Sequence, residues 1–122
     1  MAITYRIDPK QRIVFSTGRG VYTKQDVEKF VATLTADPDF EEHFSHYFDL
    51  TAVDVMDLSA NDIESIARYA PFGSESRQAF VSEKDEVFGL LRMFQAMREQ
   101  NPGTIGVFRS EREALKWLGI KL

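Results

Sequence analysis

The sequence contains no cysteine, which excludes disulfide bonds, thiol nucleophiles and thiolate metal sites, and which fits a reducing compartment. Positive charge is outnumbered: 15 basic residues against 19 acidic ones give a net charge of −4, whereas a nucleic-acid surface needs clustered Lys and Arg. No apolar run approaches the about 20 residues of a membrane-spanning helix, and the N-terminus alternates like a strand instead of forming a signal peptide. These absences predict a cytoplasmic protein with no nucleic-acid partner and no membrane insertion.

The 122 residues that are present suit one domain, which we assign to 1–122. Hydrophobic residues make up 43% of the chain, and ten of them are phenylalanine. This is enough apolar volume for one real core. We therefore expect a single globular unit with an aromatic-rich interior.

The order of elements follows from hydrophobic periodicity and from helix-start signals. Four cap residues, each followed three positions later by an acidic residue, predict helix starts in capping boxes at Thr23, Ser59, Ser82 and Ser110. The predicted strands cover 3–7, 13–19, 47–50, 78–81 and 104–108, and the longest helix covers 83–99. The short turn at 8–11 makes the first two strands an antiparallel hairpin, and alternation afterwards implies parallel pairing. The fold class is thus α/β, a mixed five-stranded sheet in the order β-β-α-β-α-β-α-β-α with flanking helices.

The central stretch 48–59 is similar in sequence to the signature region of a known family. Phe48-Asp49-Leu50-Thr51 followed by Met56-Asp57-Leu58-Ser59 resembles the signature of STAS domains, the bacterial anti-sigma-factor antagonists, in which Leu-Asp-Leu-Ser precedes Met-Asp-Ser-Ser-Gly. The whole chain resembles most closely the bacterial SpoIIAA-like, or STAS-like, domains of unknown function. The opening Ile-Thr-Tyr-Arg-Ile-Asp, the segment Ala-Asp-Pro-Asp-Phe and the stretch 77–94 carry this second resemblance.

The resemblance implies that Ser59 is a candidate phosphoacceptor or recognition residue, because it matches the phosphorylated serine of the antagonists. Leu58, Ala60 and Asn61 depart from the motif around it and would change how a kinase approaches. The alternative is a plain helix N-cap, favoured by the three similar starts elsewhere in the chain. We expect a recognition loop at 53–59 with its following helix start, containing Asp54, Asp57, Asn61 and Asp62.

Several acidic and histidine residues are of the types that bind metal ions, but we expect no metal site. Asp54 and Asp57 are more typical of a solvated loop than of a Mg²⁺ site. His43 and His46 are expected on a surface loop without a third ligand. Asp49, on an interior strand, is expected to accept backbone N–H bonds. No cofactor is implied.

The predicted helix 83–99 has an apolar face that is wider than one core-facing stripe. It predicts either a helix buried on two sides, a homodimer contact, or one wall of an apolar pocket against the sheet. The residues concerned are Phe72, Phe88, Leu91, Met93, Phe94 and Met97.

We interpret the chain as a non-enzymatic STAS-like binding domain, a regulatory protein–protein interaction module. The alternative is a carrier or sensor of a small apolar ligand or lipid, with Phe88, Leu91 and Phe94 lining its pocket and Phe72 covering it.

Overall fold

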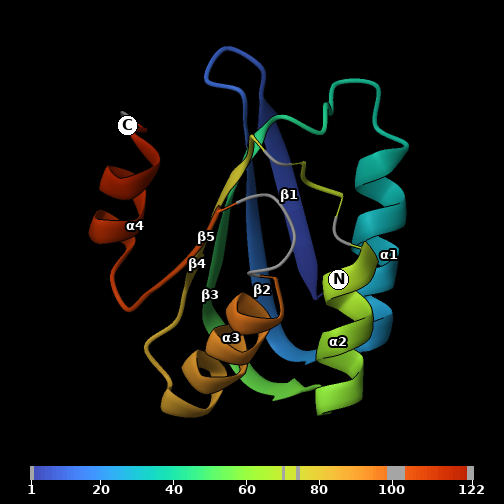
Figure 1. Ribbon diagram of the computed structural model, residues 1–122, viewed down its shortest axis with the longest axis vertical. Coiled ribbons are helices and arrows are strands. Elements are labelled where there is room, and N and C mark those ends of the chain that lie inside the picture. The colour runs from blue at the N-terminus through green and yellow to red at the C-terminus, as the bar shows by residue number, and fades with distance from the viewer. Residues whose placement is uncertain (1, 70, 74, 99–103, 121–122) are drawn as a thin grey trace.

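Four helices and five strands follow one another in the predicted order in the computed structural model (Figure 1), which describes residues 2–69, 71–73, 75–98 and 104–120. The elements are β1 (Ile3–Asp8), β2 (Ile13–Thr23), α1 (Lys24–Thr35), β3 (Ser45–Asp57), α2 (Ala60–Tyr69), β4 (Arg77–Val81), α3 (Asp85–Arg98), β5 (Thr104–Phe108) and α4 (Glu111–Leu118). None of the described helices is long and apolar enough to cross a membrane.

The strands lie side by side in the order of the chain, β1-β2-β3-β4-β5. The first pair is antiparallel and the other three pairs are parallel, so the predicted mixed five-stranded sheet with an N-terminal hairpin is confirmed. Because each parallel strand is added on the same side of the last, right-handed crossovers place α1, α2 and α3 on one face. The last helix, α4, packs on the opposite face (Figure 1).

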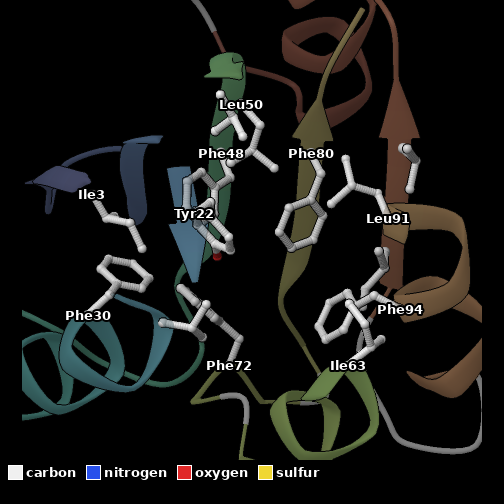
Figure 2. Close-up of a cluster of buried hydrophobic side chains, with 14 of the residues drawn as sticks. Ile3, Tyr22, Phe30, Phe48, Leu50, Ile63, Phe72, Phe80, Leu91 and Phe94 are labelled. Atoms are coloured by element: carbon white, nitrogen blue, oxygen red, sulfur yellow. The ribbon is translucent and has the colours of Figure 1, made fainter. Parts of the chain in front are cut away.

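The two faces of the sheet carry unequal cores. The larger one lies under α1, α2 and α3, where Phe30, Phe48, Phe72, Phe80 and Phe94 are all buried (Figure 2). This confirms the expected aromatic-rich interior. The smaller core joins α4 to β3, β4 and β5. Thr4, Arg6 and Arg19 are exposed, so α4 covers only part of its face.

The third strand is longer than the sequence predicted. We expected a strand over 47–50 and a loop over 53–59, but β3 runs to Asp57 and only Leu58 and Ser59 connect it to α2. The predicted loop is therefore wrong over most of its length. Two register shifts against β2 interrupt the alternation of side chains, which hid the strand in the sequence. Gly20, at one of these bulges, has a φ of 66°, a left-handed conformation that favours glycine.

Three of the four predicted helix starts are confirmed. Thr23 forms a capping box with Asp26, Ser59 forms one with Asp62, and Ser110 accepts a bond from the Glu113 N–H. The fourth is wrong: α3 begins at Asp85, and the carbonyl of Lys84 accepts its first helical bond, at 2.8 Å from the Phe88 nitrogen.

Ser82 is instead fully buried at the end of β4. Its backbone N–H donates to the Phe108 carbonyl at 3.0 Å, and its hydroxyl accepts from the Lys84 N–H at 3.3 Å. Ser82 therefore directly follows a buried strand and is not the cap of the helix.

Candidate functional site

The sheet becomes narrower at the carboxyl end of β3, because β3 extends beyond β4. β3 pairs with β4 only from His46 to Asp49, and β4 ends at Val81. Beyond that point β3 continues beside β2 alone, with Ala52 opposite Arg19 and Asp57 opposite Thr23. We call residues 19–23 and 52–57 the β2–β3 ribbon. On its β4 side, β3 from 50 to 57 has no described strand beside it, and we call this stretch the bare edge.

Side chains of the ribbon point to two very different surroundings. Tyr22 and Val53 are buried in the larger core, with 6% and 0% of their surface exposed. Val21 and Val55 pair in register and are 54% and 53% exposed. The neighbouring side chains of Val21 and Val55 are thus about half exposed to solvent at one end of the sheet.

Two carboxylates, Asp54 and Asp57, flank Val55 along β3. Asp54 and Asp57 are both exposed, and no cluster of three or more potential ligands occurs in the described ranges. Asp54 contacts Lys84 twice: the ammonium lies 3.6 Å from its carboxylate and donates to its backbone carbonyl at 3.3 Å. Exposed ion pairs of this kind contribute little stability, so the pair is easily exchanged for another.

Ser59 lies directly after the ribbon, exposed, at the start of α2. Its hydroxyl accepts from the Asp62 N–H at 3.1 Å, and its own N–H donates to the Asp62 carboxylate at 2.9 Å. The bond from the Ser59 backbone is the main cause that lowers the pKa of Asp62. Asn61 is exposed beside them. Ser59 is therefore a helix N-cap by geometry, and its phosphorylation stays a prediction.

Asp49 supports the bend from which the ribbon starts. Its carboxylate accepts from the Thr51 backbone N–H at 2.9 Å and from the Thr51 hydroxyl at 2.6 Å. The pairing with β2 shifts at this point, from Asp49 opposite Thr17 to Ala52 opposite Arg19. The expectation that Asp49 accepts a backbone N–H bond is confirmed, and it gives the residue a structural role at a β-bulge.

A small apolar pocket opens on the core side of the bare edge. Its volume is about 50 Å³, and its lining comes from β2, β3, α2, β4 and α3. The lining residues are Tyr22, Leu50, Met56, Leu58, Ile63, Ile66, Phe80, Leu90, Leu91 and Phe94. Burial raises the pKa of the Tyr22 hydroxyl, so this residue stays neutral. The predicted lining residues Leu91 and Phe94 are present.

Two other residues of the predicted pocket lie elsewhere. Phe88 is half-buried, and the guanidinium groups of Arg92 and Arg109 lie 5.1 and 4.1 Å from its ring centre. Phe72 stacks on His46 at 4.6 Å between ring centres, inside the larger core. Neither residue lines or covers the 50 Å³ pocket.

The broad apolar face of α3 is divided among three surroundings. Leu91 and Phe94 are buried and Met97 is half-buried against the larger core, while Met93 is 37% exposed. Phe88 is covered by the two arginines already described. Most of the face is therefore used within the chain.

His46 is the clearest residue that the sequence analysis misplaced. It lies in β3 and is 2% exposed, whereas we expected a surface loop. Its Nε2 lies 2.8 Å from the Ser16 hydroxyl, and burial lowers its pKa to about 3. Its Nδ1 has no hydrogen-bond partner among the described residues. The signal was its alternation with Phe48 and Leu50, which places all three on the core face of one strand.

A serine beside a histidine raises the question of nucleophilic catalysis. Ser16 is 1% exposed and His46 is 2% exposed, and aromatic rings stack on the imidazole. A substrate cannot reach a hydroxyl in this position. The pair is a buried polar contact of the core.

The chain has a larger hollow away from the ribbon, in the groove between α1 and α2. Its volume is about 480 Å³, and the charged residues Lys24 and Glu28 line it together with Val27, Val31 and Ile66. No orphaned buried polar side chain of the described residues belongs to this groove. Size alone therefore does not make it a binding site.

Comparison with known proteins identifies the fold. No protein-family model matches the chain, and no curated protein matches it. A solved structure does: the crystal structure of an uncharacterized protein of the DUF3478 family from Shewanella loihica PV-4, described as having a SpoIIAA-like fold. It superposes with a TM-score of 0.63 at 22% sequence identity, over 96% of this chain and 94% of that one. The resemblance inferred from the sequence is confirmed at the level of architecture, and the chain has a SpoIIAA-like fold.

Proposed function

We propose that this chain is a non-enzymatic, cytoplasmic protein-binding domain whose binding surface is the end of the β2–β3 ribbon together with the start of α2. The observation that carries the proposal is the in-register pair Val21 and Val55, each more than half exposed. Large apolar side chains that stay exposed next to one another mark interaction sites more often than isolated ones do.

The chemistry of this surface indicates a weak, reversible interaction. Two valines supply a small apolar centre, and Asp54 and Asp57 supply an acidic surrounding. Low-area interfaces with polar rims are typical of transient signalling contacts. The acidic rim favours a partner that presents basic side chains, because complementary charge speeds association.

Ser59 carries the regulatory part of the proposal. Only Leu58 separates it from the last residue of the ribbon, and its hydroxyl is on the exposed surface. A phosphate on Ser59 would lie at the positive end of a helix but close in sequence to Asp57 and Asp62. Added negative charge here would change both the cap and the electrostatic field of the valine surface.

The apolar-ligand alternative receives less support from the geometry. Pockets that hold small molecules have volumes of about 300–1,000 Å³, whereas the pocket between α2, α3 and the sheet measures about 50 Å³. A lipid chain does not fit there without separating α2 from α3. Protein binding is therefore the function that the surface supports best.

Affinity capture from a lysate of the native cells tests the proposal with a matched pair of variants. Val55→Glu places a charge in the valine surface, and Met93→Glu places the same charge at the exposed methionine of α3. We expect wild type and Met93→Glu to recover the same partners, and Val55→Glu to lose them by at least tenfold, with all three proteins showing the same circular dichroism. Equal recovery by Val55→Glu would overturn the proposal.

A further inference from the structure

We propose that the bare edge of β3, residues 50–57, accepts an extended peptide segment of another protein as an additional strand. This inference rests on the proposed function and specifies its partner: a segment in which small aliphatic residues alternate with basic ones. Three features of the described structure, on the edge and on both sides of it, support this occupant.

The first feature is the edge itself. β3 has 13 residues and β4 has five, so β4 covers only the first part of β3. Unpaired strand edges offer backbone N–H and C=O groups to any other extended chain. Addition of a strand to such an edge is a common mode of peptide recognition, in which main-chain bonds give affinity and side-chain pockets give specificity.

The second feature is the pocket on the inner side of the edge. Leu50 and Met56 of the bare edge line it, together with Leu58, which follows β3. Side chains of an added strand point alternately to the two faces of the sheet. One inward side chain would therefore lie over this pocket, and about 50 Å³ is close to the volume of one or two water molecules. That space suits alanine or valine and excludes an aromatic side chain.

The third feature is the outer side. Val55 is 53% exposed, whereas Val53, two residues earlier on the same strand, is fully buried. With the small aliphatic residues pointing inward, the outward side chains of the added strand are the basic ones, and the aliphatic stem of an outward lysine would pack beside Val55. A single extended peptide thus covers the edge, the inner pocket and the exposed valine together.

Charge indicates which polar residues the peptide carries. The Lys84 ammonium donates to the Asp54 carbonyl and lies near the Asp54 carboxylate. A lysine of the bound peptide could make the same two contacts. Asp57, further along the edge, is exposed. A basic peptide would replace Lys84 at Asp54, at little cost because this pair is exposed.

A capped seven-residue peptide of alternating lysine and valine is the probe, titrated into the ¹⁵N-labelled full chain and followed by NMR. We expect saturable shifts in residues 50–57 and in 82–84, and at least tenfold slower hydrogen exchange of amides in the bare edge. Lys84→Ala should tighten binding about two- to fivefold and Asp54→Asn should weaken it by a similar factor, as expected for one exposed ion pair. The same peptide N-methylated on alternate residues should not bind, because it cannot pair along its backbone.

Several outcomes would overturn strand addition. Equal binding of the N-methylated peptide would show that main-chain pairing is not the contact. Shifts confined to Val21, Val55 and the start of α2, without protection of the bare edge, would refute the added strand while leaving the proposed function standing. An absence of shifts at millimolar peptide would refute it as well. Failure of the proposed function is seen separately, in unchanged capture by Val55→Glu.

Discussion

The buried imidazole of His46 should make the protein less stable in mild acid. The ring is 2% exposed, contacts the Ser16 hydroxyl through Nε2, and stacks on Phe72. Burial lowers its pKa from 6.5 to about 3. In the unfolded chain the ring takes up a proton near pH 6.5, whereas in the folded chain it stays neutral until about pH 3. The contribution of His46 is therefore fully present above pH 6.5 and falls progressively between pH 6.5 and pH 3.

The size of the loss follows from this interval. Each pH unit between the two pKa values costs about 1.4 kcal/mol, so lowering the pH from 7.5 to 5 should remove about 2 kcal/mol of unfolding free energy. Small domains have only about 5–15 kcal/mol in total. Asp8 and Asp62 also have lowered pKa values, but carboxylates of this kind lose their contribution below about pH 4. The window from pH 7.5 to 5 therefore isolates the histidine.

Urea unfolding at pH 7.5, 6 and 5 measures the effect in wild type, in the double variant Ser16→Ala/His46→Leu, and in His43→Gln. The double variant removes the buried polar pair, so the slope of its unfolding free energy between pH 7.5 and 5 should nearly vanish, whatever its stability at pH 7.5. His43→Gln keeps the buried ring and should keep the slope. A folded wild-type protein whose His46 ring is charged at pH 5, as read from its ¹⁵N shifts, would refute the reasoning.

Four further substitutions test packing, capping and a buried hydroxyl, with thermal or urea unfolding as the measurement. Gly18→Ala should lower the free energy of unfolding by about 1–3 kcal/mol, because its Cβ would lie 2.8 Å from a methyl group of Leu50. Gly89→Ala, whose Cβ would meet nothing within 4 Å, should raise the free energy of unfolding by about 0.5–1 kcal/mol. A loss of stability in Gly89→Ala would contradict the helical conformation at this position. Ser59→Ala should cost about 1 kcal/mol as a lost cap; a cost several times larger would show that the serine does more. Tyr47→Phe should be neutral or stabilising by up to about 1 kcal/mol, since the buried hydroxyl has no partner among the described residues; a large loss would reveal an unseen bond.

Local patterns predicted most of the fold. The strand over Thr104–Phe108 and the helix cap at Gly119, which adopts a φ of 71°, follow directly from the turn and cap residues around them. The hairpin at the N-terminus follows from its short connection. These features depend on neighbours in the sequence, which is why one sequence suffices to find them.

Features that depend on distant partners were missed. His46 looks like a loop histidine until Ser16, 30 residues away, and the ring of Phe72 are placed beside it. Ser82 looks like a cap until the Phe108 carbonyl pairs with its N–H. In both cases the residue type fits a local motif, and a long-range contact decides the outcome.

The location of the candidate site follows from the order and the lengths of the strands. Open α/β sheets usually bind ligands where the strand order reverses, but here the order β1-β2-β3-β4-β5 never reverses. The usual crevice therefore does not form between the helices that follow the strands. What the sheet offers instead is a difference in length: β3 continues for eight residues beyond its last pair with β4. The surface that we propose for recognition is thus a strand edge held by β2 and Asp49, and a strand edge favours a partner that is itself extended.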